Sequence, residues 1–175
     1  MTTATPKIGL FGGIFNKDGK LLVKKREQDE SLPGEWDLPG GAVEADANAA
    51  AIDERIVSEE LLREVEEETG IQVAPFQRMP AMYPAVNKGG SDWAFGIIVG
   101  VTSLSPTKGN WRFVSPRELG ILARFPEGKR LVSGYGKRMH RLCLRMLASR
   151  DCPNPEYRAQ AGEMLQKIQQ ADSNA

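Results

Sequence analysis

The sequence predicts an α/β fold in which one β-sheet lies between two layers of helices. Strand-like segments stand before and after a central helix, and a second amphipathic helix follows near the C-terminus. Turns rich in glycine and proline separate these segments. Because a sheet must cover both apolar faces, one helical layer on each face gives an α/β/α sandwich. The elements alternate too irregularly for a doubly wound parallel sheet.

The composition is that of a globular domain. The chain has 175 residues, of which 41% are apolar and 26% charged, and its formal net charge is zero. This length supports a hydrophobic core, and a neutral chain has no general attraction to nucleic-acid polymers or anionic membranes. We expect residues 1–150 to form a single domain. Residues 151–175 should add a helix and a tail that packs on this domain or trails from it.

The cysteine content and the hydropathy predict a cytoplasmic location. Cys143 and Cys152 are too few for a disulfide framework. Met1–Pro6 is short and polar, and it lacks the apolar stretch of about 7–15 residues that a signal peptide needs. No apolar run approaches the roughly 18 residues that cross a bilayer. We therefore expect a reducing compartment and no membrane partner.

The N-terminal part of the chain predicts a hairpin. Ile8–Phe15 and Lys20–Lys25 are strand-like runs on either side of the turn signal Asn16–Gly19. A polar loop then leads to the short extended segment Trp36–Leu38. The following Pro39-Gly40-Gly41 should break the backbone, because glycine allows unusual dihedral angles and close approach of another group.

A central helix is predicted over Ser58–Thr69. Ser58 is a typical N-cap, and Gly70 is typical of the position after a helix C-terminus. If the helix extended further upstream, Ile56 and Val57 would lie on the polar face of the helix, beside Glu64 and Glu67. This conflict favours a break before Ser58.

The remaining segments complete the sheet and the second helical layer. Trp93–Leu104 is almost continuously apolar, as expected of a strand covered on both faces. Met79–Asp92 contains prolines and glycines and is predicted as a long loop, a common form of substrate lid. The other predicted elements are strands over Ile71–Phe76 and Trp111–Val114 and helices from Ser115, over Glu127–Ser149 and over Glu156–Gln170.

Three carboxylates on the central helix point to a metal site. Glu64, Glu67 and Glu68 stand at i, i+3 and i+4, so they share one helix face. Two like charges about 4 Å apart repel by roughly 4 kcal/mol at an effective dielectric near 20. A divalent cation would supply the countercharge, and oxygen ligands favour magnesium, manganese or calcium. A solvated helix face is the alternative interpretation.

The residues around these carboxylates resemble the Nudix box. Its second half is matched at every defined position by Arg63-Glu64-Val65-Glu66-Glu67-Glu68-Thr69-Gly70-Ile71. Gly34–Glu44 is similar to the stretch that opens the box, Leu21–Arg26 to the family's second strand, and Trp111–Leu119 to its late aromatic strand. The resemblance covers about residues 8–145 and implies a Nudix-like α/β/α sandwich with a mixed β-sheet.

The upstream half of the box departs from the family pattern. About eight additional residues separate Gly41 from Arg63. Arg55 stands where the family has a Glu, and Glu44 or Glu54 is the alternative for that role. Because the family Glu chiefly supports the loop, the departure concerns loop geometry and substrate fit more than metal binding.

The resemblance implies magnesium-dependent hydrolysis of a nucleoside diphosphate linked to another group, with manganese as the alternative ion. Glu67 and Glu68 are the expected main ligands, and the Gly41 carbonyl is a further one. Glu64 is expected to be a ligand or to orient or deprotonate the attacking water. In the helical projection Arg63 faces away from the carboxylates, and it is expected to hold the loop by ion pairing.

Other residues receive secondary roles. Arg26 and Tyr83 are the candidates for substrate binding, and Gly40, Glu44 and Gly70 for shaping the loop and the helix end. The candidates for a fourth acidic ligand or general base are Asp92, Glu118 and Glu127. Trp36 is expected to be a core residue. His140 is expected to be a bystander with no role in the site.

The sequence leaves the substrate and the class of function open to alternatives. A nucleoside triphosphate competes with a sugar nucleotide or ADP-ribose as substrate. A non-catalytic nucleotide sensor on the same fold is the second hypothesis. A protein-interaction domain that uses the basic stretch Lys129–Arg150 is the third. Nudix domains commonly pair, so a homodimer is a further expectation that the sequence does not test.

Overall fold

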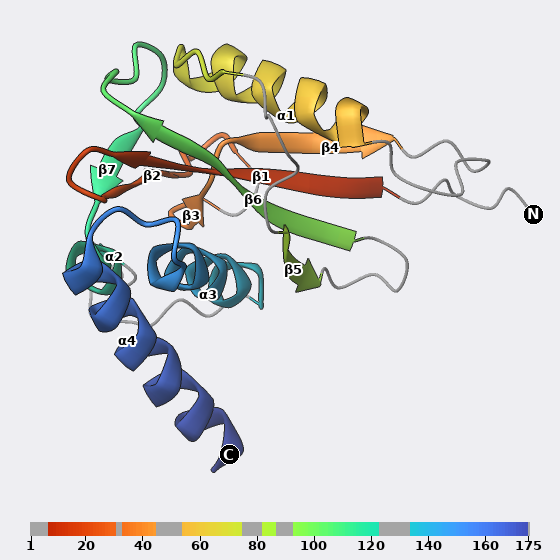
Figure 1. Cartoon of the computed structure of the whole chain (residues 1–175). Coiled ribbons are helices and arrows are strands. Elements are labelled where there is room, and N and C mark those ends of the chain that lie inside the picture. The colour runs from red at the N-terminus through yellow and green to blue at the C-terminus, as the bar shows by residue number, and fades with distance from the viewer. Residues whose placement is uncertain are drawn as a thin grey trace, which may run out of the picture.

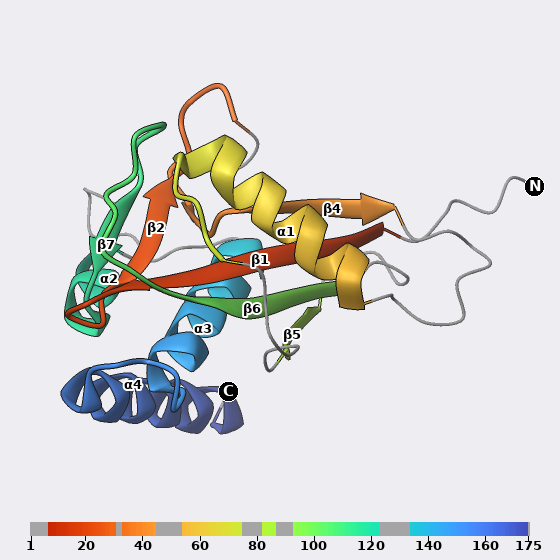
Figure 2. The same cartoon turned by 45° about the horizontal axis from the view of Figure 1, so that its top comes forward.

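The computed structural model describes residues 7–30, 33–44, 54–74, 82–86, 93–122 and 134–174. Within these ranges a seven-stranded mixed sheet lies between two helical layers (Figure 1). One layer is helix α1 (Glu54–Thr69), and the other contains α2 (Pro116–Leu122), α3 (Gly134–Ala148) and α4 (Pro155–Ser173). Figure 2 shows α1 and α3 on opposite faces of the sheet. The predicted α/β/α sandwich with a mixed sheet is confirmed.

Strand β1 is the centre of the sheet. It runs parallel to β6 and antiparallel to β2 and β4. Strand β3 pairs with β2 at one side, β5 pairs with β6 at the other, and β7 also pairs with β2. The strand bounds are β1 Lys7–Asn16, β2 Leu21–Lys25, β3 Trp36–Asp37, β4 Gly40–Glu44, β5 Met82–Val86, β6 Trp93–Thr102 and β7 Arg112–Val114.

The predicted hairpin joins β1 to β2. The Asn16 side-chain oxygen accepts hydrogen bonds from the backbone N–H groups of Asp18 at 3.1 Å and Lys20 at 2.9 Å. Gly19 has a φ of +83°, a conformation that glycine adopts without strain. The turn chemistry in the sequence therefore positions β2 beside β1.

Helix α1 begins at Glu54, so the predicted break before Ser58 is wrong. Residues 54–57 contain no glycine or proline, and each residue added to an existing helix gains one hydrogen bond. The C-terminus lies where it was predicted. Gly70 has a φ of +73°, and its N–H donates to the Glu66 carbonyl.

Three further predictions about the backbone are wrong. Ile71–Ala74 is not in a strand, and the rest of that predicted strand lies outside the described residues. The Ile71 side chain is buried all the same, so its apolar character reflects the core and not strand pairing. Strand β5 lies inside the predicted loop, where Pro84 is tolerated because β5 is an edge strand. Gly40-Gly41 begins β4 instead of breaking the backbone.

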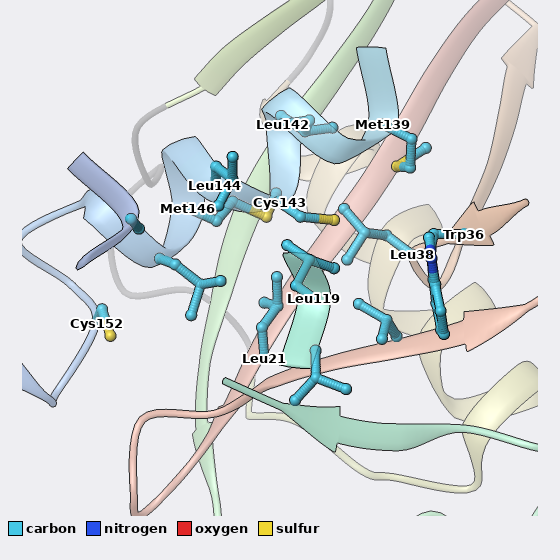
Figure 3. Packing of buried hydrophobic residues seen from close by; sticks show 14 of the residues in the cluster. Leu21, Trp36, Leu38, Leu119, Met139, Leu142, Cys143, Leu144, Met146 and Cys152 are labelled. Carbon is cyan, nitrogen blue, oxygen red and sulfur yellow. The ribbon is translucent and has the colours of Figure 1, made fainter. Parts of the chain in front are cut away.

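Two apolar clusters cover the two faces of the sheet. Alternate strand residues point to opposite faces, so Leu10 and Leu22 pack against α1, whereas Leu21 belongs to the cluster beneath α3. Figure 3 shows the α3 cluster, which contains Leu142 of α3 together with the strand residues Leu21 and Trp36. A Cβ on Gly96 would lie 2.5 Å from Leu142 Cδ1, so glycine allows the close approach of α3 to β6.

The C-terminal helix α4 packs on the same body of the protein. Its N-cap Asn154 accepts hydrogen bonds from Glu156 N–H and Tyr157 N–H, and it donates one to the Asp18 carbonyl at 2.9 Å. Partly buried residues of α4 then pack against the α3 cluster. None of the described helices is long and apolar enough to span a bilayer.

Candidate active site

The second half of α1 and the start of β4 form the first part of the candidate site. Glu68 Oε2 accepts a hydrogen bond from the Gly40 N–H at 3.0 Å. A Cβ on Gly41 would lie only 2.8 Å from the Glu64 carboxyl carbon. The two glycines therefore let the backbone of β4 reach the carboxylates of α1.

Glu68 is partly buried. Burial raises the pKa of the Glu68 carboxyl, and the Gly40 N–H and the charge of Lys24 oppose this shift. The backbone carbonyl of Glu68 accepts a hydrogen bond from Trp111 Nε1 at 3.1 Å. Strand β7 and its preceding loop thus anchor the end of α1 to the sheet.

Arg63 binds the carboxylates of its own helix. Its guanidinium lies 2.9 Å from Glu60, 2.6 Å from Glu64 and 2.7 Å from Glu67. The prediction that Arg63 faces away from these carboxylates is wrong, because the long arginine side chain folds along the helix to reach neighbours at i+1 and i+4. Its ion pairs with described residues all lie within α1.

The repulsion between the α1 carboxylates that was inferred from the sequence is therefore balanced in part by a positive charge on the same helix. Arg63 supplies one positive charge to the group that contains Glu64 and Glu67. Glu68 is held apart by Gly40, and the described residues contain no group of three potential ligands already arranged around one point. The donor chemistry still fits magnesium, since carboxylate oxygens are the ligands that hard divalent cations prefer.

Lys24 lies beside this group and was not identified from the sequence. Its ammonium is 2.7 Å from Glu30 and 5.2 Å from the centre of the Trp111 ring. Its Cα pairs with that of Asp37 across β2 and β3. In the sequence Lys24 looks like an ordinary polar residue at the end of a strand, so only the pairing of β2 with β3 reveals its position.

Arg26, Asp37 and Tyr135 form the second part of the candidate site. Arg26 lies 2.8 Å from the Asp37 carboxylate and 4.9 Å from the centre of the Tyr135 ring. The Tyr135 hydroxyl donates to Asp37 at 2.9 Å and accepts from Arg26 at 3.2 Å. Burial raises the pKa of Asp37, which Arg26 opposes, and burial together with the Asp37 charge raises the pKa of Tyr135. These contacts join the two ends of the β2–β3 connection to the start of α3.

The sequence identified one member of this cluster and missed two. Arg26 was predicted for substrate binding, while Asp37 and Tyr135 were not singled out. Asp37 is only 8% exposed. Its place between Trp36 and Leu38 was the signal in the sequence, because a carboxylate between two large apolar residues is unusual. In the sequence, Tyr135 was interpreted as one apolar position of an amphipathic helix. That pattern does not predict the contacts of its hydroxyl group.

The other predicted substrate residue, Tyr83, lies elsewhere. Its strand neighbour Pro84 accepts a hydrogen bond from Arg145, near the end of α3, whereas Arg26 contacts Tyr135 at the start. Ten residues of helix correspond to about 15 Å. Tyr83 packs against the core cluster under α3, so the structure does not bring it together with Arg26.

Some of the residues given secondary roles from the sequence lie in the described part of the structure, and others do not. Glu118 caps the start of α2 by accepting the Ser115 N–H at 2.7 Å and lies 3.3 Å from Lys20, at the opposite end of β2 from Lys24. Trp36 is a core residue, as predicted. The candidates Asp92 and Glu127 and the side chains of Glu44, Glu54 and Arg55 lie outside the described residues.

His140 was predicted to be a bystander. It lies on α3, and its Nε2 is buried without a hydrogen-bond partner among the described residues. Burial and the neighbouring Arg141 lower the pKa of His140. These observations do not connect it to the carboxylates of α1.

Comparisons with known proteins agree with this geometry. A family model for the NUDIX domain matches residues 5–133. The structure resembles the MutT protein from Methanosarcina mazei Go1 with a TM-score of 0.56 and 21% identity, over 83% of this chain and 96% of that chain. It also resembles a NUDIX hydrolase from Nitrosomonas europaea with a TM-score of 0.52 and 16% identity, over 86% and 94% of the two chains.

A search of curated proteins finds no match to this sequence. The two structural likenesses lie below 25% identity, so they bear on the fold alone. The family model, in contrast, covers most of the chain, including the helix that carries the three carboxylates. The protein therefore belongs to the Nudix family and is a hydrolase of phosphoric anhydride bonds.

Proposed function

We propose that the protein is a magnesium-dependent pyrophosphohydrolase that cleaves a nucleoside diphosphate linked to another group. The observation that carries this proposal is the approach of Gly40 and Gly41 to Glu68 and Glu64 on α1. The approach brings the backbone of β4 and the carboxylates of α1 together, and carbonyl and carboxylate oxygens are both ligands for hard cations. Manganese is the alternative ion, because it also accepts oxygen ligands.

Glu64, Glu67, Glu68 and the Gly41 carbonyl are the groups that would hold the metal. When bound, magnesium supplies charge neutralisation at the phosphates and a water of lowered pKa. In our proposal Glu67 and Glu68 act as ligands, while Glu64 orients or deprotonates the water or serves as a further ligand. Arg63, at 2.6 Å from Glu64, holds that carboxylate in position.

The basic residues along β2 are proposed to receive the substrate. Lys24 lies near the end of β2, and Arg26 directly follows that strand. Lys24 is close to the α1 group, and Arg26 is close to α3. We infer that a phosphate lies near Lys24 and that the organic part of the substrate extends toward Arg26. We do not assign Tyr83 to the subsite of Arg26, because the two residues lie near opposite ends of α3.

A triphosphate and a sugar nucleotide both fit this outline. The experiment is product analysis by chromatography after incubation with magnesium and a panel of nucleoside triphosphates, sugar nucleotides and ADP-ribose. We expect at least one to be cleaved at its pyrophosphate, with activity lost when the metal is chelated. Binding of panel members without turnover would instead support the nucleotide-sensing alternative.

The interaction-domain alternative has a different signature. It predicts protein binding through the basic helix α3 that weakens with salt and survives loss of the α1 carboxylates. A homodimer and a cytoplasmic location stay predictions from the sequence. Size measurement in solution and fractionation of cells would test them.

A further inference from the structure

The last turn of α1 carries two of the proposed metal ligands, Glu67 and Glu68. The final carbonyls of a helix have no N–H donor within it, so a last turn without outside donors frays easily. Two backbone N–H groups of residues 107–108 donate to the Thr69 carbonyl at 2.9 and 3.3 Å. Trp111 Nε1 donates to the Glu68 carbonyl at 3.1 Å, across 43 positions of sequence. The position of this turn therefore depends on the segment before β7.

Trp111 is the side-chain donor of this segment, and its surroundings fix its direction. The residue is only 7% exposed and belongs to the apolar cluster that packs against α1. A Cβ on Gly109 would lie 3.0 Å from both Cδ1 and Nε1 of the indole, and Gly109 has a φ of +65°. Glycine at this position gives the indole room and adopts the backbone conformation without strain. The buried ring thus directs its N–H to the end of α1.

The face of the same ring contacts the cation beside the α1 carboxylates. The Lys24 ammonium lies 5.2 Å from the centre of the Trp111 ring and 2.7 Å from Glu30. A cation over an indole is attracted by the negative face of the ring. Burial raises the pKa of the Glu68 carboxyl, and the charge of Lys24 is among the effects that lower it. One ring therefore holds Lys24 through its face and the Glu68 backbone through its edge.

We propose that Trp111 is a positioning residue that sets the spacing between the Lys24 ammonium and the Glu68 carboxylate. In the proposed function these two groups hold a phosphate and the metal, and hydrolysis requires both to be held in the productive geometry. This role rests on the proposed function. The anchoring of α1 by Trp111 does not, because it involves neither metal nor substrate.

The anchoring is tested by amide hydrogen exchange on the full chain without metal or nucleotide. The probes are the backbone N–H groups of residues 66–69, which exchange when the last turn of α1 opens. Trp111→Phe keeps an aromatic face for Lys24 and removes the indole N–H. We expect it to accelerate exchange at these sites by about tenfold, as for the loss of one hydrogen bond.

Trp36→Phe is the matched control. Trp36 is also a buried tryptophan with a cation over its ring, Arg112 at 5.2 Å, but it belongs to the cluster on the α3 face. Both substitutions remove one indole from the core, and urea denaturation measures the loss of global stability in each. Exchange at residues 66–69 should exceed the effect of that loss only in Trp111→Phe. Acceleration that follows global stability equally in both variants would overturn the anchoring.

Gly109→Ala tests the same contact with the indole retained. The new methyl group would meet the Trp111 ring and displace it from the Glu68 carbonyl, so exchange at residues 66–69 should again accelerate. This variant decides the matter if Trp111→Phe does not fold. Unchanged exchange in Gly109→Ala would contradict the anchoring.

The positioning role is tested by calorimetry with magnesium and by kinetics on the substrate identified in the nucleotide panel. Trp111→Phe should weaken magnesium binding by about fivefold, since a fraying turn holds its ligand less well, whereas Trp36→Phe should leave it unchanged. Trp111→Leu also removes the ring face and should raise KM. Lys24→Gln should then change KM less in the Trp111→Leu background than in the wild-type protein, because the two residues act together.

Two results would overturn the positioning role even if exchange confirms the anchoring. One is an unchanged magnesium affinity in Trp111→Phe, and the other is independent effects of Trp111→Leu and Lys24→Gln on KM. If no panel member is cleaved, the proposed function fails. Exchange and magnesium affinity still decide in that case whether Trp111 positions Glu68.

Discussion

The two parts of the candidate site are built in opposite ways. In the α1 part, the network around Arg63 is largely exposed and local, since the described ion pairs of Arg63 join residues within four positions of it in the helix. The α3 part is buried and long-range, since Tyr135 contacts Asp37 across 98 positions of sequence and Arg26 across 109. The Arg63 network can therefore form within the helix alone, whereas the contacts among Arg26, Asp37 and Tyr135 require the whole fold.

This difference assigns separate tasks to the two parts. Exposed carboxylates that are balanced by an exposed arginine can rearrange around a cation at small cost, because surface ion pairs contribute about 0–1 kcal/mol. Buried, mutually bonded groups hold a fixed geometry, because breaking one leaves a buried polar partner. In our proposal, the first part is an adaptable site for the metal and the second is a rigid site for the substrate.

The largest expected effect comes from removing one charge of the adaptable part. Glu67→Gln should reduce hydrolysis by about 100-fold or more, because it removes a proposed metal ligand. The side chain is 58% exposed and its ion pair is with Arg63, so the midpoint of urea unfolding should hardly change. Glu66→Gln is the matched control, since Glu66 contacts Gln72 on the outer surface. Full activity of Glu67→Gln would contradict the site assignment.

Removal of one hydroxyl should show the opposite pattern. Tyr135→Phe deletes the donor to Asp37 and leaves that buried carboxylate short of one partner, which should lower the free energy of unfolding by about 1–3 kcal/mol. The affinity for magnesium should stay unchanged, because Tyr135 contacts no α1 carboxylate in the described structure. Urea denaturation and calorimetry with magnesium measure the two quantities. An equal loss of metal affinity would show that the two parts are not separate.

The pH dependence of stability also distinguishes the two parts. Burial raises the pKa of Asp37 above its unfolded value, so the folded state binds this proton more tightly. The stability that Asp37 contributes is therefore fully present below the unfolded pKa and decreases as pH rises through the folded pKa. We expect the difference in stability between the wild-type protein and Asp37→Asn to fall over this range. A difference that grows with pH would show that Arg26 outweighs burial.

The smallest expected effect concerns the internal countercharge. Arg63→Gln should tighten magnesium binding by about threefold, because the carboxylates lose a competing cation at an exposed, screened position. Turnover should fall at the same time, since Glu64 loses the group that holds it. Calorimetry on the metal-free protein measures the affinity, with Arg141→Gln as a control for an exposed arginine paired on the other helical layer. Weaker magnesium binding would mean that Arg63 organises the ligands more than it competes with them.

The sequence allowed a correct account of features that depend on nearby residues. The hairpin turn at Asn16, the helix end at Gly70 and the shared face of the α1 carboxylates all follow from contacts within a few positions. The errors also have local causes. Ile71 was predicted in a strand because burial and strand pairing produce the same apolar pattern. The start of α1 was predicted too late because Ser58 is a typical N-cap and Ile56 and Val57 conflict with the polar face, although no glycine or proline interrupts residues 54–57.

Taken by itself, the sequence determined the family, the layered fold and the helix that carries Glu64, Glu67 and Glu68, because helical periodicity and motif spacing are local properties. Only the tertiary structure decided that Arg63 balances those carboxylates and that Asp37 and Tyr135 gather around Arg26. The physical reason is that side-chain direction and burial depend on which segments the sheet brings together, and no spacing along the chain encodes that pairing.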